Sequence, residues 1–284
     1  MEFTTLGRTG RTVSRLGFGG APAGLTNYLD NYSPTNHDQR EQVIAAIERA
    51  VALGITYFDT APGYGSGASE AIFGEALADA GDEIFVATKI NRDEPNVRAG
   101  IEASLTRLRR DQLDLVQIHG SSYSPDLAAS ILGDGGLLAQ LEALREEGLI
   151  RHLGFTSEDN NGAVFQFIGS GRFDVMQICY NLLHQHAYEP TRPFGSLLEA
   201  DKAGMGTVTM RTLTSGLLQK WIRQVNPNDS FDYTPALLQF VLSNPYVDVA
   251  LVGMRTADEV EHNVAIANDS AGRIDIAALH AKYV

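Results

Sequence analysis

Short apolar runs alternate with longer amphipathic stretches along the whole chain. The runs are rich in β-branched residues and almost continuous, as is typical of strands buried on both faces of a sheet. They predict eight strands, at residues 14–20, 55–60, 83–89, 113–119, 150–157, 174–181, 206–210 and 247–253. Apolar residues recur at helical spacing between them, and this spacing predicts helices that include 39–54, 97–110 and 137–148.

The alternation of eight strands with helices predicts an α/β fold of the (β/α)₈ TIM barrel type. An open doubly wound sheet is the alternative, and it would carry a glycine-rich nucleotide turn after an early strand. The segment GFGGAPAG at 17–24 misses that glycine spacing and contains Pro22, so we do not interpret it as such a turn. Residues 1–13 predict an N-terminal β-hairpin capping the barrel bottom, and 21–37 and 212–232 predict long loops.

Length and composition favour one compact enzyme-sized unit. The chain has 284 residues, and barrels of this kind commonly form a single domain of about 250 residues, so we expect one domain over 1–284. No run of 18 or more apolar residues and no apolar signal segment is present, which predicts neither a membrane span nor secretion. The single cysteine, Cys179, lies in an apolar run, which predicts a buried thiol in a cytoplasmic protein.

The charge balance limits the classes of partner. A formal net charge of −13 at pH 7 predicts a surface that repels nucleic acid and anionic lipid. His184 and His186 have a spacing found in metal sites, but no third ligand is evident. We therefore expect a solvated loop there, and neither a metal nor a nucleic acid as ligand.

Ionisable residues end three neighbouring predicted strands. Asp59 ends the second strand, Lys89 the third and His119 the fourth, and Tyr64 follows Asp59 in the loop FDTAPGYG. In a parallel barrel the carboxyl ends of the strands meet at one mouth, so these side chains are expected to converge there. Any one of them alone would be better explained as an isolated strand-end polar residue. The four together point to a catalytic site.

These residue types suit carbonyl reduction. A phenol with a pKa near ~10 is a poor acid at neutral pH, but a nearby ammonium lowers that pKa. We expect Tyr64 to act as general acid and Lys89 to tune it. Asp59 would keep the buried ammonium charged, and His119 would orient the carbonyl oxygen.

The segments FDTAPGYG, VATKI and LVQIHG resemble the three signature segments of the aldo-keto reductase family. The family's catalytic residues fall on Asp59, Tyr64, Lys89 and His119, and the resemblance runs from LGRTGRTVSRLGFGG to about Asn268. It implies the (β/α)₈ fold, a nicotinamide cofactor and reversible carbonyl–alcohol chemistry. The implied substrate is a small carbonyl compound or sugar.

The resemblance also implies which residues hold the nicotinamide. Thr156 and Ser157 stand where the family more often has Ser and Asn, and with Gln177 they would bind the carboxamide. Met210 takes the place of an aromatic residue that stacks on the ring, and a methionine covers a ring less rigidly.

The loop after the seventh strand resembles the family segment that covers the pyrophosphate. Its implied contacts are Leu213, Ser215 and Leu217. Arg211 would pair with phosphate or reach the substrate, and a surface arginine is the equal alternative.

The segment LVGMRTADEVEHN at 251–263 resembles the family's binding site for the adenosine end. Gly253 would allow close backbone approach, the following helix N-terminus favours an anion, and Asn263 matches the family. Arg255 is the candidate partner for a 2′-phosphate, whereas Glu259 would repel phosphate and suits a ribose hydroxyl. The expected cofactor is NADP(H), with NAD(H) as the open alternative.

Three aromatic residues in the two long loops are candidates to line the substrate pocket. They are Tyr28, Tyr32 and Trp221, and local packing anchors are the equal alternative. The sequence predicts neither the physiological substrate nor the oligomeric state.

Three other functions stay open beside reduction of an aldehyde or ketone. The same site could oxidise an aldose sugar or a secondary alcohol. Lys89 could form a Schiff base in an aldolase, but a carboxylate beside it would keep the amine charged and argues against this. The chain could also serve as a non-catalytic subunit that senses nicotinamide, although no dedicated partner segment is evident.

Overall fold

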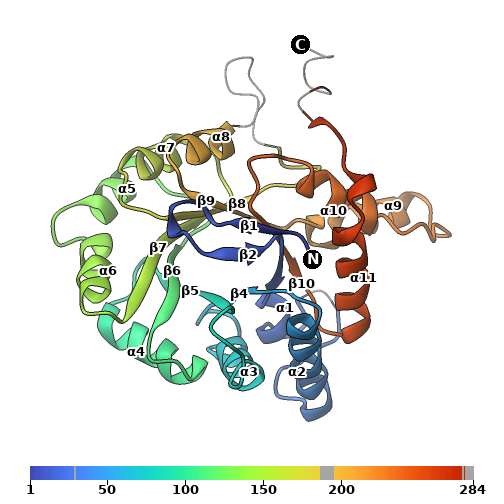
Figure 1. Cartoon of the computed structure of the whole chain (residues 1–284), viewed down its shortest axis with the longest axis horizontal. Coiled ribbons are helices and arrows are strands. Elements are labelled where there is room, and N and C mark those ends of the chain that lie inside the picture. Colours follow the sequence, from blue (N-terminus) through green and yellow to red (C-terminus); the bar gives the residue numbers. More distant parts are fainter. Residues whose placement is uncertain (29, 186–194, 277, 279–284) are drawn as a thin grey trace.

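Eight parallel strands close into a barrel in a computed structural model that describes residues 1–28, 30–185, 195–276 and 278 (Figure 1). Around the barrel the strands follow the order β10-β3-β4-β5-β6-β7-β8-β9. The predicted (β/α)₈ fold is therefore confirmed. The bounds are β3 (Leu16–Gly19), β4 (Tyr57–Asp59), β5 (Phe85–Asn91), β6 (Leu113–His119), β7 (Ile150–Ser157), β8 (Val175–Cys179), β9 (Gly206–Met210) and β10 (Val249–Gly253).

Helices surround the barrel, and several begin at polar caps. The side chains of Asn36, Asn96 and Ser124 each accept a hydrogen bond from a backbone N–H of the first helical turn. The bounds are α1 (Ala21–Gly24), α2 (His37–Ala52), α3 (Ala68–Ala76), α4 (Val97–Leu108), α5 (Pro125–Leu132), α6 (Leu137–Glu146), α7 (Gly162–Gly169), α8 (Gly195–Lys202), α9 (Leu217–Val225), α10 (Thr234–Leu242) and α11 (Ala257–Asn268). Three short 3₁₀ turns complete the described elements: η1 (Gly7–Thr9), η2 (Thr214–Gly216) and η3 (Ser270–Gly272).

The predicted N-terminal hairpin closes the barrel bottom. Strands β1 (Phe3–Thr5) and β2 (Thr12–Ser14) pair antiparallel, and they lie across the amino ends of the barrel strands in Figure 1. The turn between them is anchored because the N–H of Arg8 donates to the carbonyl oxygen of Gly204, 2.7 Å away, just before β9. Gly7 has a φ of +43°, and a Cβ there would lie 2.1 Å from the backbone nitrogen of Gly206, so this turn requires glycine.

Alternate residues of each strand point to the barrel axis and form two layers. The lower layer is an apolar plug that includes Leu6 of the hairpin turn and continues through Tyr57, Phe85, Leu115, Val175, Val208 and Val249. The residues two positions further along β4 and β8 are Asp59 and Gln177, and Lys89 and Gln117 are neighbours in the register of β5 and β6. Apolar side chains therefore fill the bottom of the barrel, and polar side chains lie directly above them.

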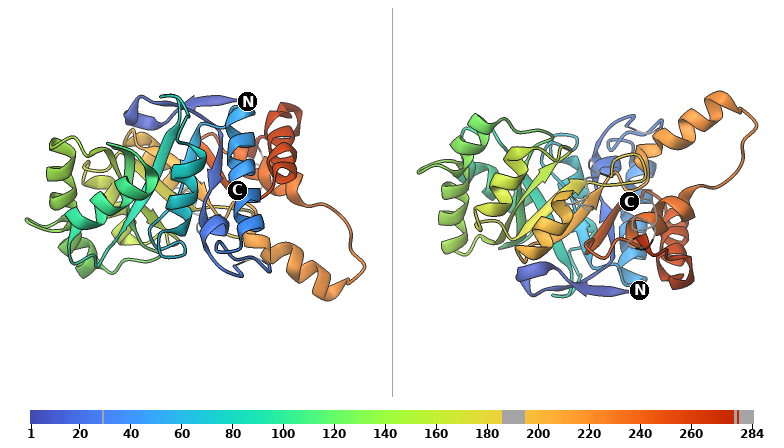
Figure 2. Two further views of the ribbon diagram at one scale, coloured as in Figure 1. Left: turned by 90° about the horizontal axis from the view of Figure 1, so that it is seen from below. Right: turned by 90° about the horizontal axis from the view of Figure 1, so that it is seen from above.

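The second long loop is the main error in the predicted fold. Residues 212–232 contain η2 and the helix α9, and in both views of Figure 2 α9 extends away from the barrel. No residue of α9 is buried. The first long loop contains the short helix α1.

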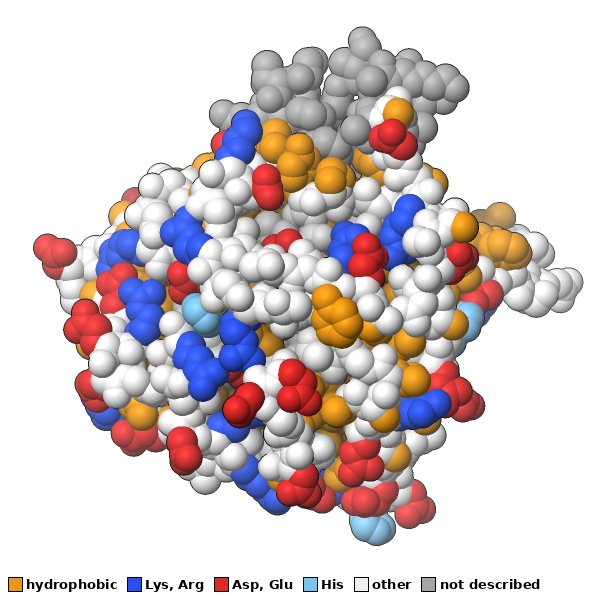
Figure 3. Space-filling view, in the orientation of Figure 1, with side chains coloured by type: hydrophobic (Ala, Val, Ile, Leu, Met, Phe, Trp, Pro, Cys, Tyr) orange, Lys and Arg blue, Asp and Glu red, His pale blue; other side chains and the backbone are white. Residues whose placement is uncertain are grey.

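The surface carries both signs of charge. On the face shown in Figure 3, acidic and basic side chains are interspersed.

By length and composition the helical stretch Pro125–Glu146 is apolar enough to span a membrane. Gly133 and Gly136 end and begin separate helices there, and α5 and α6 bury Ile131 and Leu141 in the core.

Candidate active site

The centre of the site is a buried ion pair between neighbouring strands. The Nζ of Lys89, on β5, donates to Oδ1 of Asp59 at 2.6 Å and to the carbonyl oxygen of Thr60 at 2.7 Å. The side chains of Lys89 and Asp59 are 1% and 2% exposed. Two charged groups can both be buried away from water here only because each neutralises the charge of the other and is hydrogen-bonded to it.

Tyr64 and His119 complete the group above this pair. The Nζ of Lys89 lies 4.9 Å from the centroid of the Tyr64 ring. The rings of Tyr64 and His119 meet edge to face, with centroids 5.8 Å apart and an interplanar angle of 86°. The structure therefore brings together all four residues that the sequence assigned to the barrel mouth.

Burial and charge shift the pKa values of all four groups. Burial works to lower the pKa of Lys89, but Asp59 and Tyr64 raise it above its ordinary value. Burial raises the pKa of Asp59, against the Lys89 ammonium and the amides of Gln177 and Gln117. Burial and the Lys89 charge lower the pKa of His119 to about 4. Lys89 is thus charged and His119 neutral at neutral pH.

The pKa of Tyr64 differs in direction from our expectation. Burial raises the pKa of this phenol above its ordinary value, and the nearby Lys89 ammonium opposes that rise without reversing it. The expected influence of Lys89 is present, but desolvation outweighs it because a phenolate in this position would be poorly hydrated. Tyr64 is therefore protonated at neutral pH.

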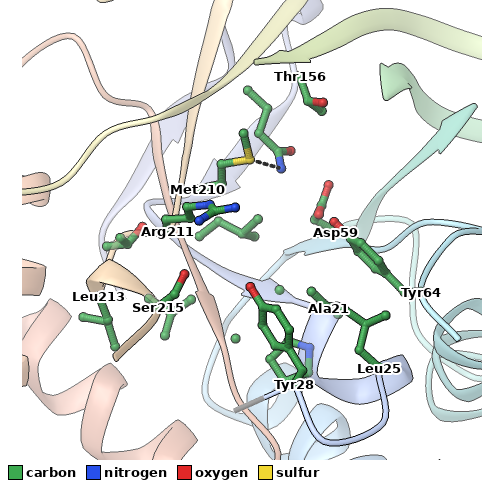
Figure 4. A pocket seen from close by; sticks show the side chains of 18 of the residues that line it. Ala21, Leu25, Tyr28, Asp59, Tyr64, Thr156, Met210, Arg211, Leu213 and Ser215 are labelled. Carbon is green, nitrogen blue, oxygen red and sulfur yellow. Dashed lines mark hydrogen bonds between the residues drawn. The ribbon is translucent and has the colours of Figure 1, made fainter. Parts of the chain in front are cut away.

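A cavity of about 420 Å³ opens above the polar layer. Figure 4 shows Asp59 and Tyr64 on one side of it, and Met210, Arg211 and Leu213 on the opposite side. The residues predicted from the sequence that line it are Tyr28, Asp59, Tyr64, His119, Thr156, Gln177, Met210, Arg211, Leu213, Ser215, Gly253 and Glu259. Lys89 lies behind this lining and reaches the site through Asp59 and Tyr64.

The predicted carboxamide pocket is only partly assembled as expected. Gln177 lines the cavity, and its Nε2 lies 3.9 Å from the sulfur of Met210. Thr156 also lines the cavity, but its hydroxyl donates to the carbonyl oxygen of Gly120 at 2.8 Å. The hydroxyl of Ser157 donates to the backbone of Asp159 at 2.9 Å and lies outside the cavity lining. Ser157 faces away because its neighbour Thr156 takes the inward position of β7.

The loop after β9 curves around the cavity in an unusual backbone conformation. Arg211, Thr214 and Ser215 have φ values of +57°, +57° and +51°, in the left-handed region that non-glycine residues rarely adopt. Arg211 pairs with Glu158 across the cavity wall, with 2.7 Å between its Nη2 and the Glu158 Oε1. The expected contact Leu217 lies outside the lining.

At the predicted adenosine end, we expected the N-terminus of the following helix, α11, to favour an anion, and it already binds a carboxylate of the chain itself, that of Glu259. The Oε2 of Glu259 accepts from the backbone N–H of Arg255 at 2.7 Å and of Thr256 at 3.2 Å, forming a capping box on α11. Arg255, the candidate phosphate partner, pairs instead with Asp30 at 2.5 Å and covers the ring of Tyr32. Asn263 lies outside the lining, and its side chain donates to the Glu259 carbonyl oxygen.

Of the three aromatic candidates for the substrate pocket, only Tyr28 lines the cavity. Tyr32 is buried, and its hydroxyl donates to the carbonyl oxygen of Ala23 at 2.7 Å, so it anchors the first loop. Trp221 is 48% exposed on α9 and lies outside the lining. Of the paired histidines, His184 follows the turn at Asn181, and His186 lies outside the described residues.

The sequence did not point to several side chains at the site, among them Glu158, Gln219 and Gln117. Glu158 and Gln219 line the cavity, and the Oε1 of Gln219 is buried without a hydrogen-bond partner among the described residues. Gln117 lies outside the cavity lining, and its side-chain amide donates a hydrogen bond to Oδ2 of Asp59. Its position two residues before His119 on the same strand was a signal, because residues two apart share a face.

Comparisons with known proteins agree with this geometry. A sequence model described as "Aldo/keto reductase family" matches residues 15–237. L-galactose dehydrogenase of Arabidopsis thaliana is 28% identical, covering 93% of this chain and 88% of that protein. Methylglyoxal reductase YeaE of Escherichia coli is 25% identical, covering 89% and 88%.

Solved structures share the same fold. An aldo-keto reductase from Bacillus halodurans, in its holo form, aligns with a TM-score of 0.73 at 24% identity, covering 95% of this chain and 92% of that one. An aldo/keto reductase from Klebsiella pneumoniae in complex with NADP and acetate aligns with a TM-score of 0.72 at 21% identity, covering 94% and 90%. Since the family model covers most of the barrel, the chain belongs to the aldo/keto reductase family and is an NAD(P)-dependent oxidoreductase.

Proposed function

We propose that this protein reduces the carbonyl group of a small aldehyde or ketone, with Tyr64 as the proton donor. The observation that carries the proposal is the arrangement at the cavity floor. Lys89, fixed by Asp59 at 2.6 Å, lies against the Tyr64 ring, and Tyr64 meets His119 edge to face. A protonated phenol beside a fixed ammonium is suited to give its proton to a developing alkoxide.

Each of the four residues has a distinct task in this proposal. His119 is neutral, so it can donate one hydrogen bond to the carbonyl oxygen without adding a charge. Tyr64 passes its proton to that oxygen, and Lys89 stabilises the phenolate left behind. Asp59 keeps Lys89 charged throughout.

The cavity residues fit a nicotinamide cofactor, which would supply the hydride. Gln177 and Thr156 place polar atoms at the inner end, and Met210 offers a polarisable side chain to cover a ring. The Oε1 of Gln219, which has no hydrogen-bond partner among the described residues, is a further buried polar atom in the lining. NADP(H) is the proposed cofactor, with NAD(H) as the alternative, because a neighbouring structure was solved with NADP and one relative is an NADH-specific methylglyoxal reductase.

Initial rates of reduced-cofactor oxidation, measured against a panel of small aldehydes and ketones, test the proposal. We expect turnover with at least one pairing of NADPH or NADH with a carbonyl compound. The Tyr64→Phe variant serves as the blank, because it keeps the ring and removes only the hydroxyl. If no pairing gives turnover that depends on Tyr64, in either direction of reaction, the proposed function is wrong.

A second candidate is oxidation of an aldose sugar or a secondary alcohol at the same site. It is favoured by the ion pair of Arg211 and Glu158 in the cavity wall, which offers donors and acceptors to several hydroxyl groups. The similarity to L-galactose dehydrogenase also supports it. Arg211→Met should raise the KM for aldoses with NADP⁺ or NAD⁺ and leave the KM for apolar aldehydes unchanged. An equal effect on both substrate classes would remove this candidate.

The geometry disfavours the aldolase alternative. A Schiff base requires a neutral amine, but Asp59 and Tyr64 keep Lys89 charged, and Lys89 lies behind the cavity lining.

We further propose one domain over 1–284 and a cytoplasmic location. The closed barrel with its hairpin and the buried free thiol of Cys179 support these two points.

A further inference from the structure

Gln117 joins the proton-donating side of the site to its cofactor side. It is fully buried on β6, and its Nε2 donates to Oδ2 of Asp59 at 3.1 Å and to Oε1 of Gln177 at 3.0 Å. We propose that Gln117 is a positioning residue that couples the Asp59–Lys89 ion pair to the amide of Gln177. The inference rests on the proposed function, because it concerns the same site.

The first half of the coupling concerns Asp59. Its Oδ1 is taken by Lys89 and its Oδ2 by Gln117, so both carboxylate oxygens receive a donor in a position without solvent. A donor to a buried carboxylate favours the ionised form. Gln117 thereby helps to keep Asp59 charged, and a charged Asp59 is what keeps Lys89 charged next to Tyr64.

The second half concerns the orientation of Gln177. Because Gln117 occupies its Oε1, the amide nitrogen of Gln177 is directed toward the sulfur of Met210 at the cavity wall (dashed line in Figure 4), while the same amide also helps to lower the pKa of Asp59. A thioether is a weak acceptor, so this N–H group keeps most of its capacity for a ligand oxygen. Gln177 lines the cavity and Gln117 does not, so Gln117 acts through its neighbour.

The amide of Gln117 can satisfy its surroundings in one orientation only. Both of its neighbours, Asp59 and Gln177, present oxygen atoms to it. A rotated amide would set its own oxygen against these two acceptors. In the orientation observed, the Oε1 of Gln117 has no hydrogen-bond partner among the described residues. The two donated bonds are therefore the contacts that hold the amide in this orientation.

The variant Gln117→Met tests the coupling, because it keeps the length of the side chain and removes both donated hydrogen bonds. The acid limb of the pH profile of kcat should shift to higher pH by about one unit, because Asp59 loses a hydrogen-bond donor and its pKa rises. The Kd of NADPH, measured by fluorescence titration without substrate, should rise about fivefold, as expected for one misaligned hydrogen bond. A merely structural change would move neither of these readouts.

A matched control is Gln239→Met, at another buried glutamine. Gln239 donates to the backbone oxygens of Ile266 and Asp269 and lies outside the cavity lining. This control should lower Tm without changing the acid limb or the Kd. The variant Gln117→Glu is the conservative partner, because its protonated form can still donate one of the two hydrogen bonds. Its NADPH affinity, relative to the wild type at the same pH, should therefore recover in part as the pH falls.

The two variants leave the proposal open to refutation. If Gln117→Met lowers Tm but keeps the wild-type acid limb and Kd, Gln117 is a packing residue and the coupling is wrong. Should Gln117→Met fail to fold, Gln117→Glu decides, and an affinity relative to the wild type that does not depend on pH overturns the coupling. Failure of the proposed function is a separate outcome, because Tyr64-independent turnover would refute it while the binding titration still measures the effect of Gln117.

Discussion

The ammonium of Lys89 and the carboxylate of Asp59 lie 2.6 Å apart, and neither side chain is more than 2% exposed. The two residues come from adjacent strands, β5 and β4, whose register fixes their separation. Removing two ions from water is unfavourable, and their mutual attraction offsets it only while both are present. The pair is therefore a site where single substitutions have large and informative effects.

Asp59→Asn should lower the free energy of unfolding by about 3–5 kcal/mol, because it leaves the buried ammonium of Lys89 without a counter-ion. Lys89→Met should have a similar effect through the unpaired carboxylate. The double variant Asp59→Asn/Lys89→Met should be more stable than either single variant, although inactive. Urea unfolding of the four proteins measures this cycle, and additive losses in the double variant would show that the two groups do not interact.

His119 should titrate far below an ordinary histidine, because burial and Lys89 lower its pKa to about 4. The unfolded chain takes up this proton near pH 6.5, so the native state loses stability as the pH falls from about 6.5 to 4. The loss attributable to His119 is about 3 kcal/mol at most. His119→Gln should lack this part of the loss.

An NMR titration, with the His119 resonance assigned by its absence in His119→Gln, checks the value directly. A midpoint near pH 6.5 would contradict the lowered pKa, and a midpoint above pH 7 would contradict the neutral role given to this imidazole in the reaction.

Glu259→Gln should shift the cofactor preference toward NADP(H). Glutamine can keep the capping-box contact with the backbone of Arg255 and Thr256 while removing the negative charge beside the cavity. The ratio of Kd values, NADPH over NADH, should fall about five- to tenfold, as expected for removing one nearby like charge. Fluorescence titration of both cofactors measures it. An unchanged ratio would mean that Glu259 does not face the ribose.

Asp248→Asn should stabilise the barrel bottom at neutral pH. Asp248 accepts from the backbone N–H of Thr207 at 2.9 Å, and burial raises its pKa to about 6. A carboxyl with a raised native pKa contributes stability that is lost as the pH rises from about 3.8 to 6, and asparagine has no such loss. The variant should gain roughly 1–3 kcal/mol at pH 8 and nothing near pH 3.5. Thermal unfolding at both pH values measures it, and an equal gain at both would exclude the ionisation as the cause.

Much of this architecture could be predicted because each barrel strand is buried on both faces, and its sequence is therefore an unbroken apolar run. The segments at β6 and β7 were predicted with the same bounds that the structure has. The helix α9 was missed because TLTSG precedes it, a sequence typical of loops, and its residues Thr214 and Ser215 do have left-handed backbone angles. The apolar spacing of Leu217, Trp221 and Val225 was nevertheless a helical signal.

At the site, the four polar residues at the barrel mouth could be found because Asp59 and His119 end their strands, Lys89 lies two residues before the end of β5, and Tyr64 follows in the loop after β4. What the sequence did not reveal was which hydrogen bonds each side chain already makes. Ser157, Arg255 and Glu259 all bind neighbouring groups of the chain, and only three-dimensional proximity determines those partners. The inward position of Gln117 was readable from strand alternation, but its two acceptors were not.

The most direct measurement of the central claim is kcat for Tyr64→Phe at pH 7, together with the Kd of the reduced cofactor. Loss of a general acid should lower kcat by about 10²–10⁴-fold, while the Kd stays within about twofold, because the phenol hydroxyl gives its proton to the substrate rather than holding the cofactor. A variant that keeps near wild-type turnover, or that loses cofactor binding together with activity, would contradict the account.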